Sequence, residues 1–279
     1  MAISSTDQLV SALGQAQRIP FGRDASYAPT TLAFTNMLDS TGGALWKGIP
    51  GVGVDAGFPN LATTLVTSAS ANCGVIPFTD PGVGNLLYLA QAHVQAARPG
   101  TLLIFDRIAS WRTISNGANG GMSGTLAVPN GPDPRNYSGG RGVELWAELM
   151  AAAGGSVTLT PTYTNAEGTS GRVGPGLTIP SGAQNRTMWR FGLAAGDRGV
   201  RSVQSINSSG TALGNNVLVS LVRQIAAVPV GVSGQLFDFA SLGLPNIPAS
   251  AGLSLAFAPA DTSGSVQMDV LGTLTIVEG

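Results

Sequence analysis

Apolar and polar positions alternate through most of the chain after Thr101, and Gly, Asn, Ser and Asp turns separate the alternating runs. A period of two is typical of half-buried strands. The pattern continues near the end of the sequence, where VQMDVLGTLTIV alternates. About eight strands at this spacing predict a mainly β protein with an antiparallel β-sandwich or jelly-roll-like body. The predicted strands cover residues 102–108, 143–153, 156–164, 186–193, 199–206, 216–225, 252–257 and 266–277.

One of these strands also fits another element. Val143–Ala153 alternates like a strand, but its run of alanines favours a helix. We predict a strand, because Gly154-Gly155 and the following SVTLTPTYT complete the signature of a β-hairpin. Turns are predicted at 165–168, 197–199 and 208–210, and a long loop at 116–140.

Two short helices are predicted in the first hundred residues. Ser5 and Gln8 have the spacing of a capping box, which opens a helix near 6–17. A second helix is predicted near 85–98, because Pro99-Gly100 follows and one helical face would carry Leu86, Leu89, Ala90, Val94 and Ala97.

The stretch Phe21–Gly84 between these helices is rich in Pro and Gly and has little regular pattern. Such length without regular structure is unusual inside a compact domain. It predicts either an arm that lies on another surface or an insertion packed against the chain's own body. The expected organisation is an irregular N-terminal region over 1–99 and a β-sandwich body over 100–279.

Charge is scarce, since only 10% of the residues are charged and the net charge is −1. Either neighbouring molecules cover much of the surface, or uncharged polar side chains form the solvent face. The charge argues against direct binding to nucleic acid or to a membrane surface. The start, MAISSTDQLV, lacks a signal-peptide pattern, and no run of 18 apolar residues predicts a membrane helix, so synthesis in a cytoplasm is expected.

No combination of residues predicts catalysis, a cofactor or a metal. His93 is the single histidine and Cys73 the single cysteine, so neither has a partner of its own kind. Several carboxylates lie beside arginines, and Glu144 and Glu148 share one face of either a strand or a helix, where a solvated face is the simpler interpretation. We therefore expect no catalytic, cofactor-binding or metal-binding residues, and no enzyme activity.

Three motifs resemble a family of tailed-bacteriophage structural proteins. They are a leucine-rich strand that ends in Asp-Arg at 102–107, a Thr-Tyr-Thr-Asn turn with Gly-Arg at 162–172, and Gly-Asp-Arg-Gly-Val-Arg-Ser-Val at 196–203. The resemblance covers residues 100–279 well and the first hundred poorly, and Arg198 occupies a variable place. Physically, the last motif suits a tight turn from which Arg201 could reach a carboxylate of the same or a neighbouring chain.

The resemblance implies a virion component assembled in the bacterial host cytoplasm. Our leading hypothesis is a capsid decoration (cement) protein that binds the major capsid protein and copies of itself, as a homotrimer. The alternatives are a neck, tail or fibre protein, including a receptor-binding module, and a phage-borne glycan hydrolase, which would need two facing carboxylates in a cleft.

Overall fold

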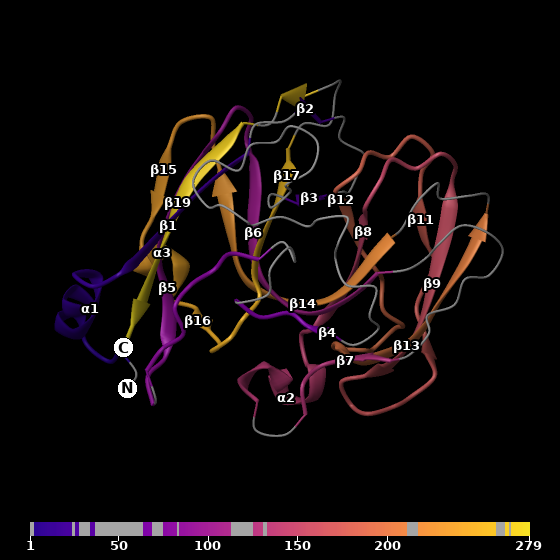
Figure 1. Cartoon of the computed structure of the whole chain (residues 1–279), viewed down its shortest axis with the longest axis horizontal. Coiled ribbons are helices and arrows are strands. Elements are labelled where there is room, and N and C mark those ends of the chain that lie inside the picture. The colour runs from indigo at the N-terminus through magenta and orange to yellow at the C-terminus, as the bar shows by residue number, and fades with distance from the viewer. Residues whose placement is uncertain are drawn as a thin grey trace.

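The computed structural model describes residues 3–23, 26–27, 34–36, 64–68, 75–82, 84–112, 125–130, 133–210, 217–260, 266–267 and 269–279. Across these residues the protein is mainly β and antiparallel, as the sequence predicts, with short helices at the edges (Figure 1). The helical elements are α1 (Thr6–Leu13), η1 (Pro134–Asn136), α2 (Tyr137–Gly140) and α3 (Phe239–Leu242).

Three sheets form the body, and we name them by position. The terminal sheet has the order β1-β19-β5-β15 with β16 also on β5, and the distal sheet has the order β10-β9-β13-β7 with β11 also on β9. The strands of the terminal sheet are β1 (Gln17–Arg23), β5 (Leu87–Ala96), β15 (Gln235–Phe237), β16 (Asn246–Ile247) and β19 (Val270–Glu278). Those of the distal sheet are β7 (Leu126–Ala127), β9 (Val157–Asn165), β10 (Arg172–Val173), β11 (Leu177–Ile179) and β13 (Val200–Gly210).

The central sheet has the order β14-β8-β12-β3-β17-β6-β4, and a further pairing of β14 with β6 closes six of these strands into a ring. Its strands are β3 (Phe34–Asn36), β4 (Thr64–Leu65), β6 (Gly100–Arg112), β8 (Glu144–Leu149), β12 (Thr187–Arg190), β14 (Val217–Val230) and β17 (Leu253–Pro259). A separate small pair joins β2 (Ser26–Tyr27) to β18 (Val266–Gln267).

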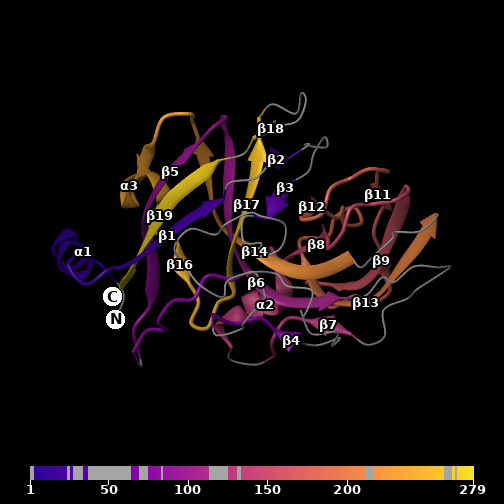
Figure 2. The same cartoon turned by 45° about the horizontal axis from the view of Figure 1, so that its top comes forward.

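Two hydrophobic cores lie on either side of the central sheet. One joins it to the terminal sheet, and the other joins it to the distal sheet. The long strands β6 and β14 contribute to both cores, with Leu102 and Val228 in the first and Trp111 and Val219 in the second. Both views show the terminal sheet on the left, the distal sheet on the right, and the central sheet with β6 and β14 between them (Figures 1 and 2).

A third cluster fills the inside of the ring. Phe105 of β6 stacks on Trp146 of β8 with ring centroids 6.1 Å apart, and Phe34 of β3 lies 4.9 Å from the same tryptophan. β6 is therefore buried on both faces, as its continuous apolar run predicts.

The helix predicted over Asn85–Arg98 is wrong, because this segment forms β5. The buried residues Leu87, Leu89, Ala92, Val94 and Ala96 face the first core, while His93 and Gln95 are exposed. β5 pairs with β19 on one edge and with β15 and β16 on the other. These pairings and the burial of one face outweigh the local helical preference of its leucines and alanines.

Other boundaries also differ from the prediction. The first helix ends at Leu13, so it is shorter than 6–17, and Pro20 lies inside β1, an edge strand that tolerates a missing N–H. The strand over 143–153 is confirmed as β8, but the hairpin is wrong, because β8 pairs with β12 and β14 while β9 pairs with β13 in the distal sheet. The turn predicted at 208–210 is wrong as well, since β13 continues through it.

The predicted boundary near residue 99 does not separate the described sheets. β1 and β5 pair with β19, and the buried residues Val66 and Ile76 hydrogen bond to the backbone of β6 and β17. These described parts of the first hundred residues are therefore packed on the body. Most of Phe21–Gly84, including 37–63, lies outside the described residues, so an arm there stays a prediction.

Candidate functional site

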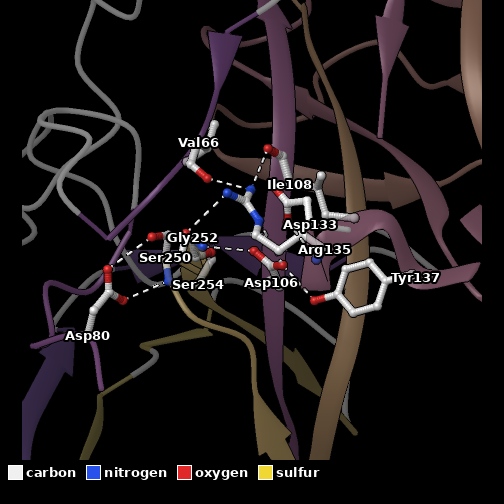
Figure 3. A network of polar contacts seen from close by, with 10 residues as sticks. All are labelled: Val66, Asp80, Asp106, Ile108, Asp133, Arg135, Tyr137, Ser250, Gly252 and Ser254. Atoms are coloured by element: carbon white, nitrogen blue, oxygen red, sulfur yellow. Dashed lines mark hydrogen bonds and ion pairs between the residues drawn. The ribbon is translucent and has the colours of Figure 1, made fainter. Parts of the chain in front are cut away.

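Polar side chains form three clusters around the carboxylates of Asp106, Glu148 and Asp197. The first surrounds Asp106, which lies in β6 and is fully buried (Figure 3). Its Oδ2 accepts a hydrogen bond from the hydroxyl of Tyr137 at 2.6 Å and lies 3.4 Å from Nε of Arg135. Its Oδ1 accepts from the backbone N–H of Gly252 at 2.8 Å. One carboxylate thus links β6, the α2 region and the start of β17.

Arg135 extends this Asp106 cluster to the neighbouring backbone. Its Nη2 donates to the carbonyl oxygens of Val66 at 2.5 Å and Ile108 at 2.6 Å, and its Nη1 donates to that of Ser250 at 3.1 Å (Figure 3). The side chain itself is positioned by its own turn, because Asp133 Oδ1 accepts from the N–H of Arg135 at 2.7 Å.

Burial dominates the electrostatics of the Asp106 cluster. It raises the pKa of Asp106 although Arg135 and the hydrogen bond from Tyr137 act in the opposite direction. Burial and the neighbouring carboxylate also raise the pKa of Tyr137, so this phenol stays protonated and donates its hydrogen bond at neutral pH.

The second cluster lies inside the ring of the central sheet. Nη2 of Arg107 lies 3.0 Å from Oε2 of Glu148, and Nη1 of Arg186 lies 3.9 Å from Oε1 of the same carboxylate. Arg107 also donates to Oγ of Ser220 at 3.2 Å, and Ser220 hydrogen bonds to Ser110 at 2.7 Å. All these side chains are buried, so one carboxylate is shared by two buried cations.

The third cluster surrounds Asp197, beside the turn that joins β12 to β13. Its Oδ2 accepts from the hydroxyl of Tyr163 at 2.5 Å and lies 3.0 Å from Nε of Arg172, and its Oδ1 accepts from Nδ2 of Asn165 at 2.9 Å. Burial raises the pKa of Asp197, but these three hydrogen bonds outweigh it, so the pKa lies below its ordinary value. Burial and the hydrogen bond to Asp197 raise the pKa of Tyr163 to about 12.

The Asp197 cluster joins two of the resembling motifs. Thr162–Arg172 contributes Tyr163, Asn165 and Arg172, and Gly196–Val203 contributes the aspartate. The turn predicted at 165–168 is confirmed, with the N–H of Gly168 bonded to the carbonyl of Asn165 at 3.0 Å. Asp197 pairs with Arg172 rather than with its neighbour Arg198, which is exposed.

The remaining candidates do not come together. His93 is exposed on β5, Cys73 lies outside the described residues, and Glu144 pairs with the exposed Arg190 at 3.2 Å. Within the described ranges, no group of three or more His, Cys, Asp or Glu side chains could hold a metal ion. Arg135 and Tyr137 were missed by the sequence reasoning, because both lie in a segment predicted only as loop.

The three clusters share one chemical property. The buried carboxylates Asp106, Glu148 and Asp197 each lie beside at least one arginine. Because removal of one partner of a buried ion pair is strongly destabilising, each carboxylate ties together the strands and turns that supply its partners.

Comparisons with known proteins do not assign this chain to a family. No known protein family matches the sequence, and no curated protein matches it. Among solved structures, a structure of the Gt strain of infectious bursal disease virus is 8% identical, covers 95% of this chain and 82% of its own, and has a TM-score of 0.19. A crystal structure of the VP2 subviral particle of the same virus has 8% identity, 94% and 80% coverage, and a TM-score of 0.18. The arabinosyltransferase EmbB from Mycobacterium smegmatis gives 10% identity, 62% and 24% coverage, and a TM-score of 0.19. Scores this low do not establish a shared fold.

None of the described helices has the length and apolar character needed to span a membrane.

Proposed function

We propose that this protein is a structural component of a tailed-bacteriophage virion and that it decorates the capsid shell, where it binds the major capsid protein. The observation that carries this proposal is that charged residues of the motifs at 102–107 and 196–203, which resemble the phage family, lie in the internal polar clusters. Asp106, Arg107 and Asp197 lie in internal clusters that link the sheets and turns of the body. A body stabilised in this way serves as a rigid element of an assembly, and no catalysis is part of the proposal.

The low charge of the chain supports the same function. With 10% charged residues and a net charge of −1, little repulsion keeps copies of the chain apart or away from an apolar partner. We propose that the copies associate as trimers around the symmetry axes of the shell. In this proposal the N-terminal region of the chain contacts neighbouring capsid subunits.

Stabilisation of the shell then follows from mass action. A protein that binds the assembled, expanded shell and not its separate subunits stabilises the shell, by about 2.7 kcal/mol per site when its free concentration is 100 times Kd. Repeated sites on a symmetric shell add avidity.

The test is binding of the purified protein to expanded shells that lack it. Co-sedimentation should show saturable binding to expanded shells, and the temperature at which the shells disrupt should rise. Unexpanded shells of the same capsid protein are the matched control and should bind at least tenfold more weakly. Failure to bind expanded shells contradicts the proposal, and binding to isolated tails instead would move the protein to the tail.

The enzymatic alternative has its own test. Incubation of the protein with the polysaccharide of the host should release no reducing ends. Release of reducing ends at a rate above that of a heat-denatured sample would replace the structural proposal by a glycan hydrolase.

A further inference from the structure

A groove with a volume of about 720 Å³ lies beside β14. It shares Asp133 and Tyr137 with the surroundings of Asp106, and its other lining residues lie outside the three clusters. Three segments form its walls: residues 223–225 of β14, the loop around α2 from 133 to 142, and the segment 245–248, which contains β16. The groove is open to solvent, and Tyr137 separates it from the buried carboxylate of Asp106.

One wall of this groove is the edge of a strand. β14 pairs with β6 from Leu218 to Val230, but on its other edge it pairs with β8 only from Val217 to Val222. From Arg223 to Val230, no described strand pairs with that second edge. Pro229 lies in this part of β14, and a proline is tolerated within a long strand where its missing N–H faces an unpaired side. An unpaired edge of this kind is a template for another strand.

The same groove carries positive charge. Arg223 donates from Nη1 to the carbonyl oxygen of Arg141 at 2.6 Å, and its guanidinium lies 5.1 Å from the ring centroid of Tyr137. Arg141 itself is exposed, and neither arginine has a carboxylate partner among the residues that the structure describes. Asp133 is the single acid in the lining, and its Oδ1 already accepts the N–H of Arg135.

The loop that presents Arg141 is held in a fixed shape. Tyr137 and Ser138 have positive φ angles of 46° and 56°, which non-glycine residues rarely adopt, and glycines follow them. The N–H of Gly142 donates to the carbonyl oxygen of Arg198 at 2.8 Å, and Arg141 forms a bridge with Gly199. The backbone at Arg141 is therefore fixed beside the groove before any partner binds, which lowers the entropy cost of ordering this loop.

We propose that this groove binds an extended, acidic segment of a neighbouring protein, which adds as a strand to the free edge of β14. Backbone hydrogen bonds to that edge would supply affinity, and the carboxylates of the segment would bind Arg141 and Arg223. A segment of about six residues, roughly 20 Å in extended form, is sufficient. The identity of this neighbour as a capsid shell protein rests on the proposed function, whereas the chemistry of the groove does not.

A peptide fits these features better than a nucleic acid does. A phosphate backbone uses positive charge but has no use for a strand edge, and the chain as a whole has a net charge of −1. Arginine binds carboxylates through two parallel hydrogen bonds, which suits a site with two arginines and no lysine.

The test compares two charge reversals of exposed arginines in the shell-binding assay. R141E changes the groove, and R18E makes the same change on β1, where Arg18 is exposed and forms no ion pair with a carboxylate among the described residues. R141E should weaken binding to expanded shells at least tenfold, and R18E less than twofold, with unchanged unfolding midpoints for both. Hydrogen exchange on shell-bound wild-type protein should show new amide protection within Arg223–Val230.

The outcomes separate this inference from the proposed function. If R141E and R18E bind expanded shells equally well, or if the amides of β14 gain no protection, the proposed peptide site in the groove is overturned, while the proposed shell function stands. If the wild type does not bind shells at all, the shell function fails, and a labelled peptide of alternating valine and aspartate decides the groove. Binding of that peptide that is lost in R141E supports the inference. No binding overturns it, as does tighter binding of a single-stranded oligonucleotide.

Discussion

Arg107 and Glu148 form an ion pair of 3.0 Å inside the ring of the central sheet, with side chains that are 0% and 1% exposed. They come from β6 and β8, which do not pair with each other but both pair with β14. The ion pair therefore spans β14 on the inner face, where Ser220 of that strand also accepts a hydrogen bond from Arg107. Asp106, the neighbouring residue in β6, contributes to a different cluster, so one Asp-Arg dipeptide holds two parts of the body.

Glu148→Gln tests the importance of this buried charge. The substitution keeps the shape of the side chain but leaves Arg107 and Arg186 buried without their negative partner. We expect the free energy of unfolding to fall by about 3–5 kcal/mol, measured by chemical denaturation. Glu144→Gln on the same strand is the matched control, because its partner Arg190 is 61% exposed, and it should cost less than about 1 kcal/mol. Equal effects of the two substitutions would contradict this account.

Asp197→Asn tests the contact between the two turn motifs. The amide has one acceptor where the carboxylate accepts from Tyr163, Asn165 and Arg172, so donors are left without partners. A loss of about 2 kcal/mol is expected. Glu167→Gln, an exposed acid in the neighbouring turn, serves as the control and should change the stability by less than about 0.5 kcal/mol. A wild-type stability in the Asp197 variant would show that the cluster does not hold the turns.

The same aspartate predicts a pH dependence. The pKa of Asp197 is lower in the folded protein than its ordinary value of 3.8, so the ionised form stabilises the fold. This contribution is fully present above about pH 5 and is lost as the pH falls through the lowered pKa. Burial raises the pKa of Asp106 instead, so ionisation of this group lowers the stability as the pH rises, and it does so equally in the wild type and in Asp197→Asn. The difference in unfolding free energy between wild type and Asp197→Asn isolates the first effect and should shrink below about pH 4. A difference that stays constant from pH 7 to 3 would refute it.

Gly140→Ala tests the close approach of the α2 loop to β13. Gly140 has a φ of +101°, and a Cβ there would lie 2.3 Å from the carbonyl oxygen of Val200. Because backbone cannot move aside cheaply, we expect a loss of more than about 2 kcal/mol. Gly171→Ala is the control: its φ of +70° is also unfavourable for alanine, but nothing lies within 4 Å, so only about 1 kcal/mol is expected. Thermal unfolding of both variants distinguishes steric overlap from backbone strain alone.

The sequence predicts the fold class because alternation is strong where one sheet face is buried. It fails at β5, where Leu, Ala and Gln are good helix formers and the deciding contacts come from β19, far away in the sequence. It fails again for the hairpin of β8 with β9, because the turn signal of Gly154-Gly155 says nothing of which sheet receives each strand.

The polar clusters were predictable only in part. The turn at 165–168 and the turn beside Asp197 follow from local residue types. The partners of Asp106 and Glu148 do not, since Arg135 in the short helix η1 and Arg186 in a turn are far in sequence from the carboxylates that they reach in the folded protein. The free edge of β14 depends on where β8 ends, which no local pattern records.

We propose above that this protein covers the shell of a tailed-phage particle. The most direct measurement is its copy number in purified virions, from quantitative gel densitometry scaled to the major capsid protein. A decoration protein should be present in hundreds of copies, in a fixed ratio to the capsid protein. A few to tens of copies per virion would place it in the neck, tail or fibre, and absence from purified virions would contradict a structural role in the particle.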